Sequence, residues 1–134
     1  MKARLLHEAD GQRTYVVILQ TGDEAMSQLK AFAERERLTA ARLTAIGAFQ
    51  GTVLGYFDWN EKTYRRNHVA EQVEVASFIG DIALEKGDQV SLHAHVVLGR
   101  ADGGALAGHL LEGRVRPTLE VMYDRMGFVK PARG

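Results

Sequence analysis

The sequence predicts an α+β fold in which one main helix packs against a strongly curved or barrel-like antiparallel β-sheet. One segment places apolar residues at three- and four-residue steps, which is the pattern of an amphipathic helix. Most of the remaining chain consists of short β-favouring runs separated by glycine or polar turns. One helix with many strands is typical of the α+β class. The 134 residues fit a single domain, residues 1–134, with a hydrophobic core of its own.

The predicted helix spans Asp23–Leu38 and follows a short predicted strand, Tyr15–Leu19. Thr21-Gly22-Asp23 reads as a turn into the helix N-cap, because a short polar side chain there can accept a hydrogen bond from a free backbone N–H group. The charged residues of the segment occupy other positions than the apolar ones, so we expect one face to pack on the sheet. The residues of that face are Ala25, Met26, Leu29, Phe32 and Ala33.

The predicted strands follow Thr39 as a series of short segments. Turn-forming sequences separate them, as at residues 60–62 and 85–88. Pro117 falls inside one predicted strand, which favours an edge or a bulge there because proline has no N–H group to donate. The segments are Arg42–Phe49, Thr52–Trp59, Thr63–Val69, Val73–Ala83, Val90–Leu98, Leu106–Leu111 and Val115–Tyr123.

The composition narrows the classes of function. Lysine and arginine together number 17, and so do aspartate and glutamate, so the zero net charge provides no global attraction to nucleic acid or to an anionic membrane. There is no cysteine, so a metal site would have to use imidazole and carboxylate ligands. The first residues lack the long apolar run of a signal peptide, and no apolar run is long enough to cross a bilayer. These features favour a cytoplasmic protein that does not associate with membranes.

His93, His95 and His109 form the most informative pattern in the chain. Residues two apart on a strand point to the same face, so the first two histidines would share one face. A hairpin that returns through a short glycine-containing turn would bring the third histidine beside them. The spacing therefore predicts that three imidazoles converge on one point.

Two hairpin registers satisfy this condition. If His95 lies opposite His109, the turn is centred on Asp102, and Gly103 takes the position that favours a positive φ angle. If His93 lies opposite His109, the centre moves to residue 101 and the three imidazoles still share a face. The glycine pattern favours convergence, because a two-residue turn would send His109 to the other face.

Three neutral imidazoles with a free fourth position match a catalytic zinc site rather than a closed structural one. Zinc is therefore the first choice, with nickel, copper or iron as alternatives. A carboxylate is expected nearby to orient a ligand or to act as general base, and Glu120 and Glu74 are the candidates. The competing interpretation takes the histidines as ordinary polar residues of a half-exposed sheet. That interpretation suits His7 and His68, which have no such neighbours.

A DNA-binding interpretation has weaker support in the sequence. Residues 113–117, Gly-Arg-Val-Arg-Pro, resemble the core of a minor-groove AT-hook, but Val115 stands where the hook has glycine. Arg65 and Arg66 could extend a basic surface, although scattered arginines on a neutral protein usually form a solvated face. The neighbouring aromatic residues, expected either in the core or at an oligomer interface, are Tyr56, Phe57 and Trp59.

A further pattern is the order of six segments along the chain: residues 47–49, 54–58, 74–82, 92–95, 108–110 and 118–121. Together these segments resemble the PPC domain, the "plants and prokaryotes conserved" family. The similarity extends from about Tyr15 to Tyr123, and the order of the segments is more specific than any one motif. One departure is Ala107, where the family commonly has a glycine before Gly-His-Leu.

The resemblance implies an α+β fold with a curved antiparallel sheet, and a homotrimer. It also implies a distant similarity in fold to α-acetolactate decarboxylase, a zinc enzyme whose ligands include a His-x-His pair and a later histidine. Carried over to this chain, the resemblance makes His93, His95 and His109 the metal ligands. In plants the domain accompanies AT-hooks and is labelled DNA-binding, but this chain has no hook.

Two functions are consistent with these observations. The first is a homotrimeric domain whose three-histidine site, with zinc or another divalent transition metal, binds or transforms a small ligand. Carbonyl or carboxylate ligands would suit a Lewis-acidic zinc. The second is a DNA-associated regulatory or oligomerisation module that lacks an AT-hook. The neutral charge favours the first function.

Overall fold

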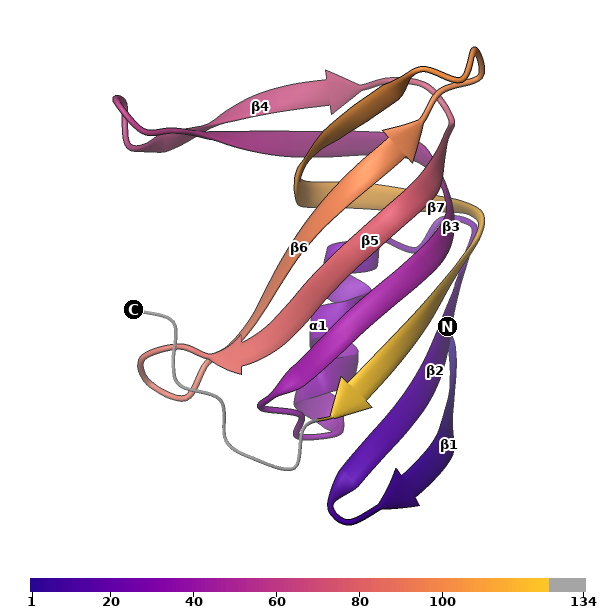
Figure 1. Ribbon diagram of the computed structural model, residues 1–134, viewed down its shortest axis with the longest axis vertical. Helices are drawn as coiled ribbons and strands as arrows, with labels where there is room; N and C mark the ends of the chain where they lie inside the picture. Colours follow the sequence, from indigo (N-terminus) through magenta and orange to yellow (C-terminus); the bar gives the residue numbers. More distant parts are fainter. Residues whose placement is uncertain (126–134) are drawn as a thin grey trace.

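The computed structural model describes residues 1–125. Within these residues seven strands form one antiparallel sheet, and a single helix lies behind the strands in the view of Figure 1. The strand order is β1-β2-β7-β6-β5-β3-β4, and β7 also pairs with β3, so that β3, β5, β6 and β7 close a ring of strand pairs. The predicted α+β class is confirmed. The elements are β1 (Lys2–Ala9), β2 (Gln12–Gln20), α1 (Ala25–Arg35), β3 (Ala41–Asp58), β4 (Thr63–Val69), β5 (Val73–Leu84), β6 (Val90–Gly99) and β7 (Ala105–Arg125).

Helix α1 begins two residues later and ends three residues earlier than the predicted span of residues 23–38. Glu24 rather than Asp23 is the N-cap, and its carboxylate accepts hydrogen bonds from two backbone N–H groups of the first turn at 2.8 and 3.0 Å. The same carboxylate accepts a third, at 2.8 Å, from the backbone N–H group of Gly113 in β7. One side chain therefore caps the helix and ties it to the sheet. No helix in residues 1–125 is long and apolar enough to cross a membrane.

The hydrophobic core lies between α1 and the face of the sheet that it covers, called here the inner face. The ring of Phe32 contacts the rings of Tyr123 and Tyr15 at centroid distances of 5.0 and 5.3 Å. The hydroxyl of Tyr123 donates a 2.7 Å hydrogen bond to the carbonyl oxygen of Leu29 in the helix. Because side chains alternate along a strand, every second residue points instead to the outer face. The three histidines lie on that outer face.

Strands β3 and β7 are each continuous where the sequence predicted two strands. Their pairing shifts register at three places, so the expected breaks are irregularities within long strands rather than turns. Pro117 lies at one of these shifts, between the pair Gly47 with Leu119 and the pair Phe49 with Val115. The bulge predicted at Pro117 is confirmed.

Strand β1 has no counterpart among the predicted strands. All 8 of its residues are exposed, and it pairs only with β2 at the edge of the sheet. A strand that buries neither face needs no alternation of apolar and polar residues, so the pattern that reveals the other strands is absent here.

The distal parts of β3 and β4, residues 55–67, extend from the body as a two-stranded arm, at the upper left of Figure 1. Its aromatic side chains are exposed, with 72% of Trp59 and 63% of Tyr56 accessible. Phe57 contacts both Trp59 and Tyr64, at centroid distances of 5.9 and 5.4 Å. The core alternative for these aromatic residues is therefore wrong, and the interface alternative stays a prediction.

Candidate metal centre

The β6–β7 hairpin brings the three histidines together on the outer face. His95 lies opposite His109 in the ladder, and two backbone hydrogen bonds of 2.8 and 2.9 Å close the turn across residues 100–104. Gly103 has a φ of 86°, in the left-handed region that favours glycine. Of the two registers that the sequence left open, the one centred on Asp102 is confirmed.

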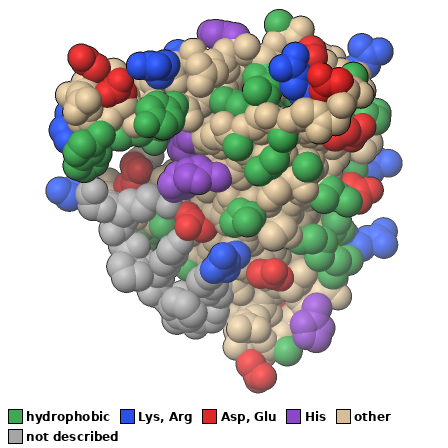
Figure 2. Space-filling view, turned by 45° about the horizontal axis from the view of Figure 1, so that its top comes forward, with side chains coloured by type: hydrophobic (Ala, Val, Ile, Leu, Met, Phe, Trp, Pro, Cys, Tyr) green, Lys and Arg blue, Asp and Glu red, His purple; other side chains and the backbone are tan. Residues whose placement is uncertain are grey.

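The three imidazoles lie close enough to share one ion. The Nε2 atoms of His93 and His95 are 3.2 Å apart. Ring centroids are separated by 4.8 Å for His93 and His95, 4.8 Å for His93 and His109, and 5.7 Å for His95 and His109. One ring nitrogen of each residue lies within 4.8 Å of the other two. In Figure 2 histidine side chains, in purple, lie near the middle of this face, below the green side chains at the upper left.

These distances fit a metal bound by three imidazoles. Tetrahedral zinc at its usual bond length places ligand nitrogens about 3.3 Å apart, close to the 3.2 Å between His93 and His95. A hydrogen bond between these two rings would have a similar length, but it would not explain why His109 lies beside both of them. The Nδ1 atom of His109 is buried and has no hydrogen-bond partner among the described residues, which costs about 1–3 kcal/mol. A metal held through this nitrogen would remove that cost.

The electrostatics of His109 favour the form that binds metal. Burial, followed by the neighbouring His93 and His95, lowers the pKa of His109 from its ordinary 6.5 to about 4. The imidazole is therefore neutral at pH 7, with a lone pair available for a metal ion. Tyr64 stacks on the same ring at a centroid distance of 4.9 Å and an angle of 29°, which holds its orientation.

Asp81 in β5 places a carboxylate beside the histidines. It lies directly opposite His93 in the β5–β6 ladder, on the same face, at a position that the sequence analysis missed. The sequence contained the information to predict this position. A hairpin centred on Gly87, in the predicted turn at residues 85–88, places Asp81 opposite His93. Asp81 can therefore serve as the partner that orients a histidine ligand.

The structure brings neither Glu120 nor Glu74 to the histidines. Glu120 lies opposite Ile46 in β3, and Glu74 lies opposite Gly99 at the far end of the β5–β6 ladder. Both glutamates are exposed, and neither belongs to the histidine group or lines the two cavities beside it. The other two histidines, His7 and His68, are also exposed and lie outside the group.

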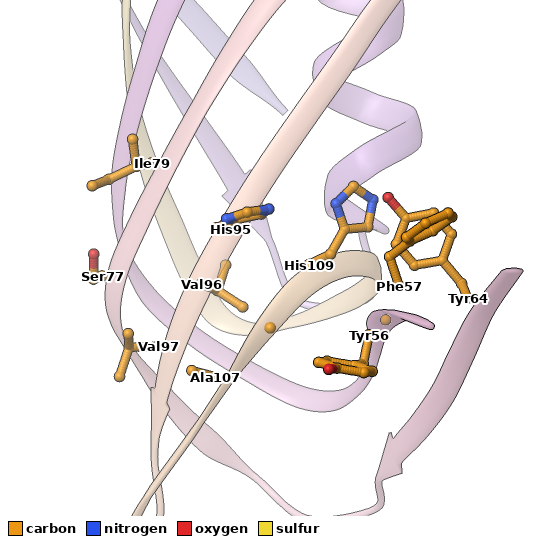
Figure 3. Close-up of a pocket in the computed structure, with 12 residues that line it drawn as sticks. Tyr56, Phe57, Tyr64, Ser77, Ile79, His95, Val96, Val97, Ala107 and His109 are labelled. Carbon is orange, nitrogen blue, oxygen red and sulfur yellow. The ribbon is translucent and has the colours of Figure 1, made fainter. Parts of the chain in front are cut away.

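An open pocket of about 600 Å³ begins at His95 and His109. Figure 3 shows both imidazoles beside the same space, with aromatic side chains of the arm on one side and Ile79 and Val97 on the other. Pockets of this size and apolar character accept small organic molecules. The arrangement can therefore hold a metal at one end and an apolar group at the other. The aromatic side chains of the pocket are Tyr56, Phe57 and Tyr64.

Several solved structures share this fold and part of the sequence. A plant- and prokaryote-conserved (PPC) protein from Pyrococcus horikoshii is 29% identical, with a TM-score of 0.85 over 98% of this chain and 87% of that chain. A metal-containing protein from Archaeoglobus fulgidus is 30% identical, with a TM-score of 0.83 over 90% of this chain and 84% of that chain. A protein from Bacteroides thetaiotaomicron, whose name provisionally assigns DNA binding, is 27% identical, with a TM-score of 0.85 over 95% of this chain and 86% of that chain.

A more distant likeness concerns the fold alone. A Staphylococcus aureus protein similar to α-acetolactate decarboxylase is 14% identical, with a TM-score of 0.57 over 81% of this chain and 51% of that chain. The predicted distant similarity in fold is confirmed. A comparison with curated proteins found no match.

The sequence matches the family described as the Plants and Prokaryotes Conserved (PCC) domain over residues 6–125. This is the family, abbreviated PPC above, that the order of segments indicated, and the match covers almost all of the described residues. The chain belongs to the Plants and Prokaryotes Conserved domain family.

Proposed function

We propose that this protein is a homotrimeric domain that holds a divalent metal at His93, His95 and His109 and binds or transforms a small ligand there. The observation that carries the proposal is the approach of three imidazoles to one point at the end of an open pocket. Zinc is the first choice of metal, because it accepts three histidines and retains a fourth position for a ligand. When bound, such a metal supplies Lewis acidity to a carbonyl or carboxylate oxygen.

The residues around the histidines have separate roles in this proposal. Asp81 orients His93 from the neighbouring strand, and Tyr64 holds the ring of His109 by stacking. The apolar walls of the pocket contact the apolar part of the bound ligand and displace water from it. The metal-containing relative from Archaeoglobus fulgidus supports the presence of a metal.

The homotrimer is supported by the exposed aromatic arm. Trp59, Tyr56, Phe57 and Tyr64 present a group of apolar side chains to solvent, and groups of this kind usually mark contacts with another protein surface. Light scattering after size-exclusion chromatography would give the mass directly. We expect three chains per particle, and a Trp59→Ser, Tyr56→Ser variant should shift the mass toward the monomer. A monomeric wild-type protein at micromolar concentration would contradict this part of the proposal.

Metal content tests the proposed site. Protein purified without chelators is expected to contain about one metal ion per chain, measured by inductively coupled plasma mass spectrometry. His93→Ala and His109→Ala should lose the metal, because each removes one of only three ligands. His68→Ala is the matched control, since His68 is exposed on β4 and outside the group. Wild-type protein that is folded but free of metal would overturn the proposal.

A DNA-associated role is the second candidate. The Bacteroides thetaiotaomicron relative carries a provisional DNA-binding name, and Arg114, Arg116 and His68 line one cavity of about 470 Å³ in this chain. Direct phosphate contacts predict an affinity for duplex DNA that falls steeply with salt. Absence of any gel shift at low ionic strength would exclude direct binding. A platform for other DNA-binding proteins would then be tested by pull-down.

A further inference from the structure

A second cavity adjoins the pocket of aromatic side chains and, unlike that pocket, is lined by an arginine and an aspartate. It has a volume of about 270 Å³ and is lined by Arg42, Asp81, His93 and His95. Ile79 and His95 line both this charged cavity and the aromatic pocket. The proposed metal position therefore lies where the two cavities meet, and a bound molecule could extend into both.

Among residues 1–125, Arg42 is the one lysine or arginine that lines either cavity. It is exposed on β3, where it lies between Asp81 of β5 and Asp124 of β7 in the ladders. Its guanidinium makes no ion pair or hydrogen bond with another described residue, whereas Asp124 accepts a 2.8 Å hydrogen bond from the hydroxyl of Thr14. The planar guanidinium is thus available to a carboxylate, which it can bind through two parallel hydrogen bonds.

The local charge favours an anion once a metal is present. The charges of a divalent ion and of Arg42 outweigh the negative charges of Asp81 and Asp124, which leaves a net charge of about +1. Imidazoles add no charge, since they must be neutral to bind the metal. A monoanionic ligand would therefore neutralise the site, and a neutral ligand would leave the charge uncompensated.

The aromatic pocket requires an apolar group at the other end of the same ligand. Ile79 and Val97 are 56% and 38% exposed on one wall, opposite the aromatic side chains of the arm. Exposed apolar walls around a cavity gain free energy when a hydrocarbon group displaces the water between them. The aromatic wall additionally favours a flat ring.

We propose that the ligand of this site is a small monocarboxylate that carries an apolar, preferably aromatic, group. Arg42 binds the carboxylate in the charged cavity beside the metal, and the apolar group occupies the pocket between Ile79 and Tyr64. This inference rests on the proposed metal site. In it, Arg42 is the residue that makes the site prefer negatively charged ligands to neutral ones.

Calorimetric titration of metal-loaded protein with three probes tests the assignment. Phenylacetate has both features, acetate lacks the apolar group, and phenylacetamide lacks the charge. We expect phenylacetate to bind about tenfold or more tightly than either of the others, as is typical for loss of a charge-assisted hydrogen bond or of a buried ring. The metal content of each sample is measured alongside, so that loss of metal is separated from loss of ligand.

Variants at Arg42 then test its role. Arg42→Gln should bind phenylacetate no more tightly than phenylacetamide while it keeps its metal, and Arg42→Lys should restore part of the preference. Arg116→Gln is the matched control, because Arg116 is also exposed but lines neither cavity at the histidines. Circular dichroism checks that each variant is folded.

The outcomes separate the two proposals. Metal-loaded protein that binds phenylacetate and phenylacetamide equally, or an Arg42→Gln variant that keeps the preference, would overturn the inference and leave the metal site in place. Folded wild-type protein without metal would overturn both. Tight binding of acetate alone would overturn the role of the apolar pocket, because charge would then suffice.

Discussion

The two faces of strand β6 differ in what they contribute to the molecule. Ala94, Val96 and Leu98 are at most 2% exposed and pack into the core beneath α1. His93 and His95 alternate with them and point to the outer face, which α1, the one helix of residues 1–125, does not cover. A period of two residues therefore lets one strand build the core and the candidate metal site at once. The buried face holds the backbone in place, and the outer face uses that fixed geometry to position imidazoles.

A large change on the inner face should lower the stability of the fold without changing the candidate metal site. Phe32→Ala removes a buried ring that contacts Tyr15 and Tyr123, and it should lower the free energy of unfolding by about 3–5 kcal/mol, measured by urea denaturation. Any protein that remains folded should bind metal with unchanged stoichiometry. A folded Phe32→Ala variant that lacks metal would show that the two faces are not separable in this way.

A change beside the histidines should affect metal affinity instead. Asp81→Asn removes the carboxylate opposite His93, and such partners of metal ligands typically alter affinity by about 10–100-fold. Competition with a chromophoric chelator measures the effect. Glu74→Gln on the same strand is the control and should leave the affinity unchanged. If Glu74→Gln or Glu120→Gln weakened binding while Asp81→Asn did not, the supporting carboxylate would be one that the sequence suggested.

The pH dependence of the metal-free protein should reveal the partly buried histidine. The pKa of His109 is about 4 in the folded protein and 6.5 in its ordinary state, so the unfolded chain binds more protons between these values. The contribution of His109 to the free energy of unfolding should therefore be complete above pH 6.5, and the free energy of unfolding should decrease as the pH falls toward 4. Urea denaturation of chelator-treated protein across this range measures it.

A His109→Gln variant should show a weaker pH dependence over the same range, whereas His68→Ala should behave like the wild-type protein. Identical pH profiles for wild type and His109→Gln would contradict the depressed pKa of His109 in the folded state.

Two adjacent valines provide the finest test of the difference between the faces. Val96→Ala removes methyl groups from the core and should cost about 1–2 kcal/mol of unfolding free energy. Val97→Ala makes the same chemical change on the outer face, where the side chain is 38% exposed, and should change stability by no more than about 0.5 kcal/mol. Equal losses for the two variants would mean that another surface covers the outer face during unfolding measurements, as in a stable oligomer.

Local pattern predicted most of the elements but not their continuity. The limits of β4 agree with prediction, and those of β2, β5 and β6 agree to within a few residues, because each shows clear β-favouring composition between turn residues. The long strands β3 and β7 were predicted in pieces, since glycine indicates a bulge or a turn equally well until the partner strand is known. The exposed edge strand β1 left no pattern to detect.

The residues of the candidate site could be predicted where a single hairpin brings them together, but not where strands that are distant in the sequence do. His95 and His109 are joined by a single turn, so parity along the chain placed them on one face. The same reasoning applied to the β5–β6 hairpin would have found Asp81. Arg42 reaches the site because β3 pairs with β5, a contact between strands that are not consecutive in the chain. No local rule predicts such a pairing.

The sequence by itself determined the class of fold, the family and three histidines able to meet on one face, because these depend on alternation, turn chemistry and the order of motifs. Only the tertiary structure decided what surrounds them: which carboxylate lies beside His93, which arginine lines the next cavity and which aromatic side chains form the pocket. The physical reason is that a ladder within one hairpin is set by its turn, whereas pairing between distant strands is set by how the whole sheet buries its inner face against α1.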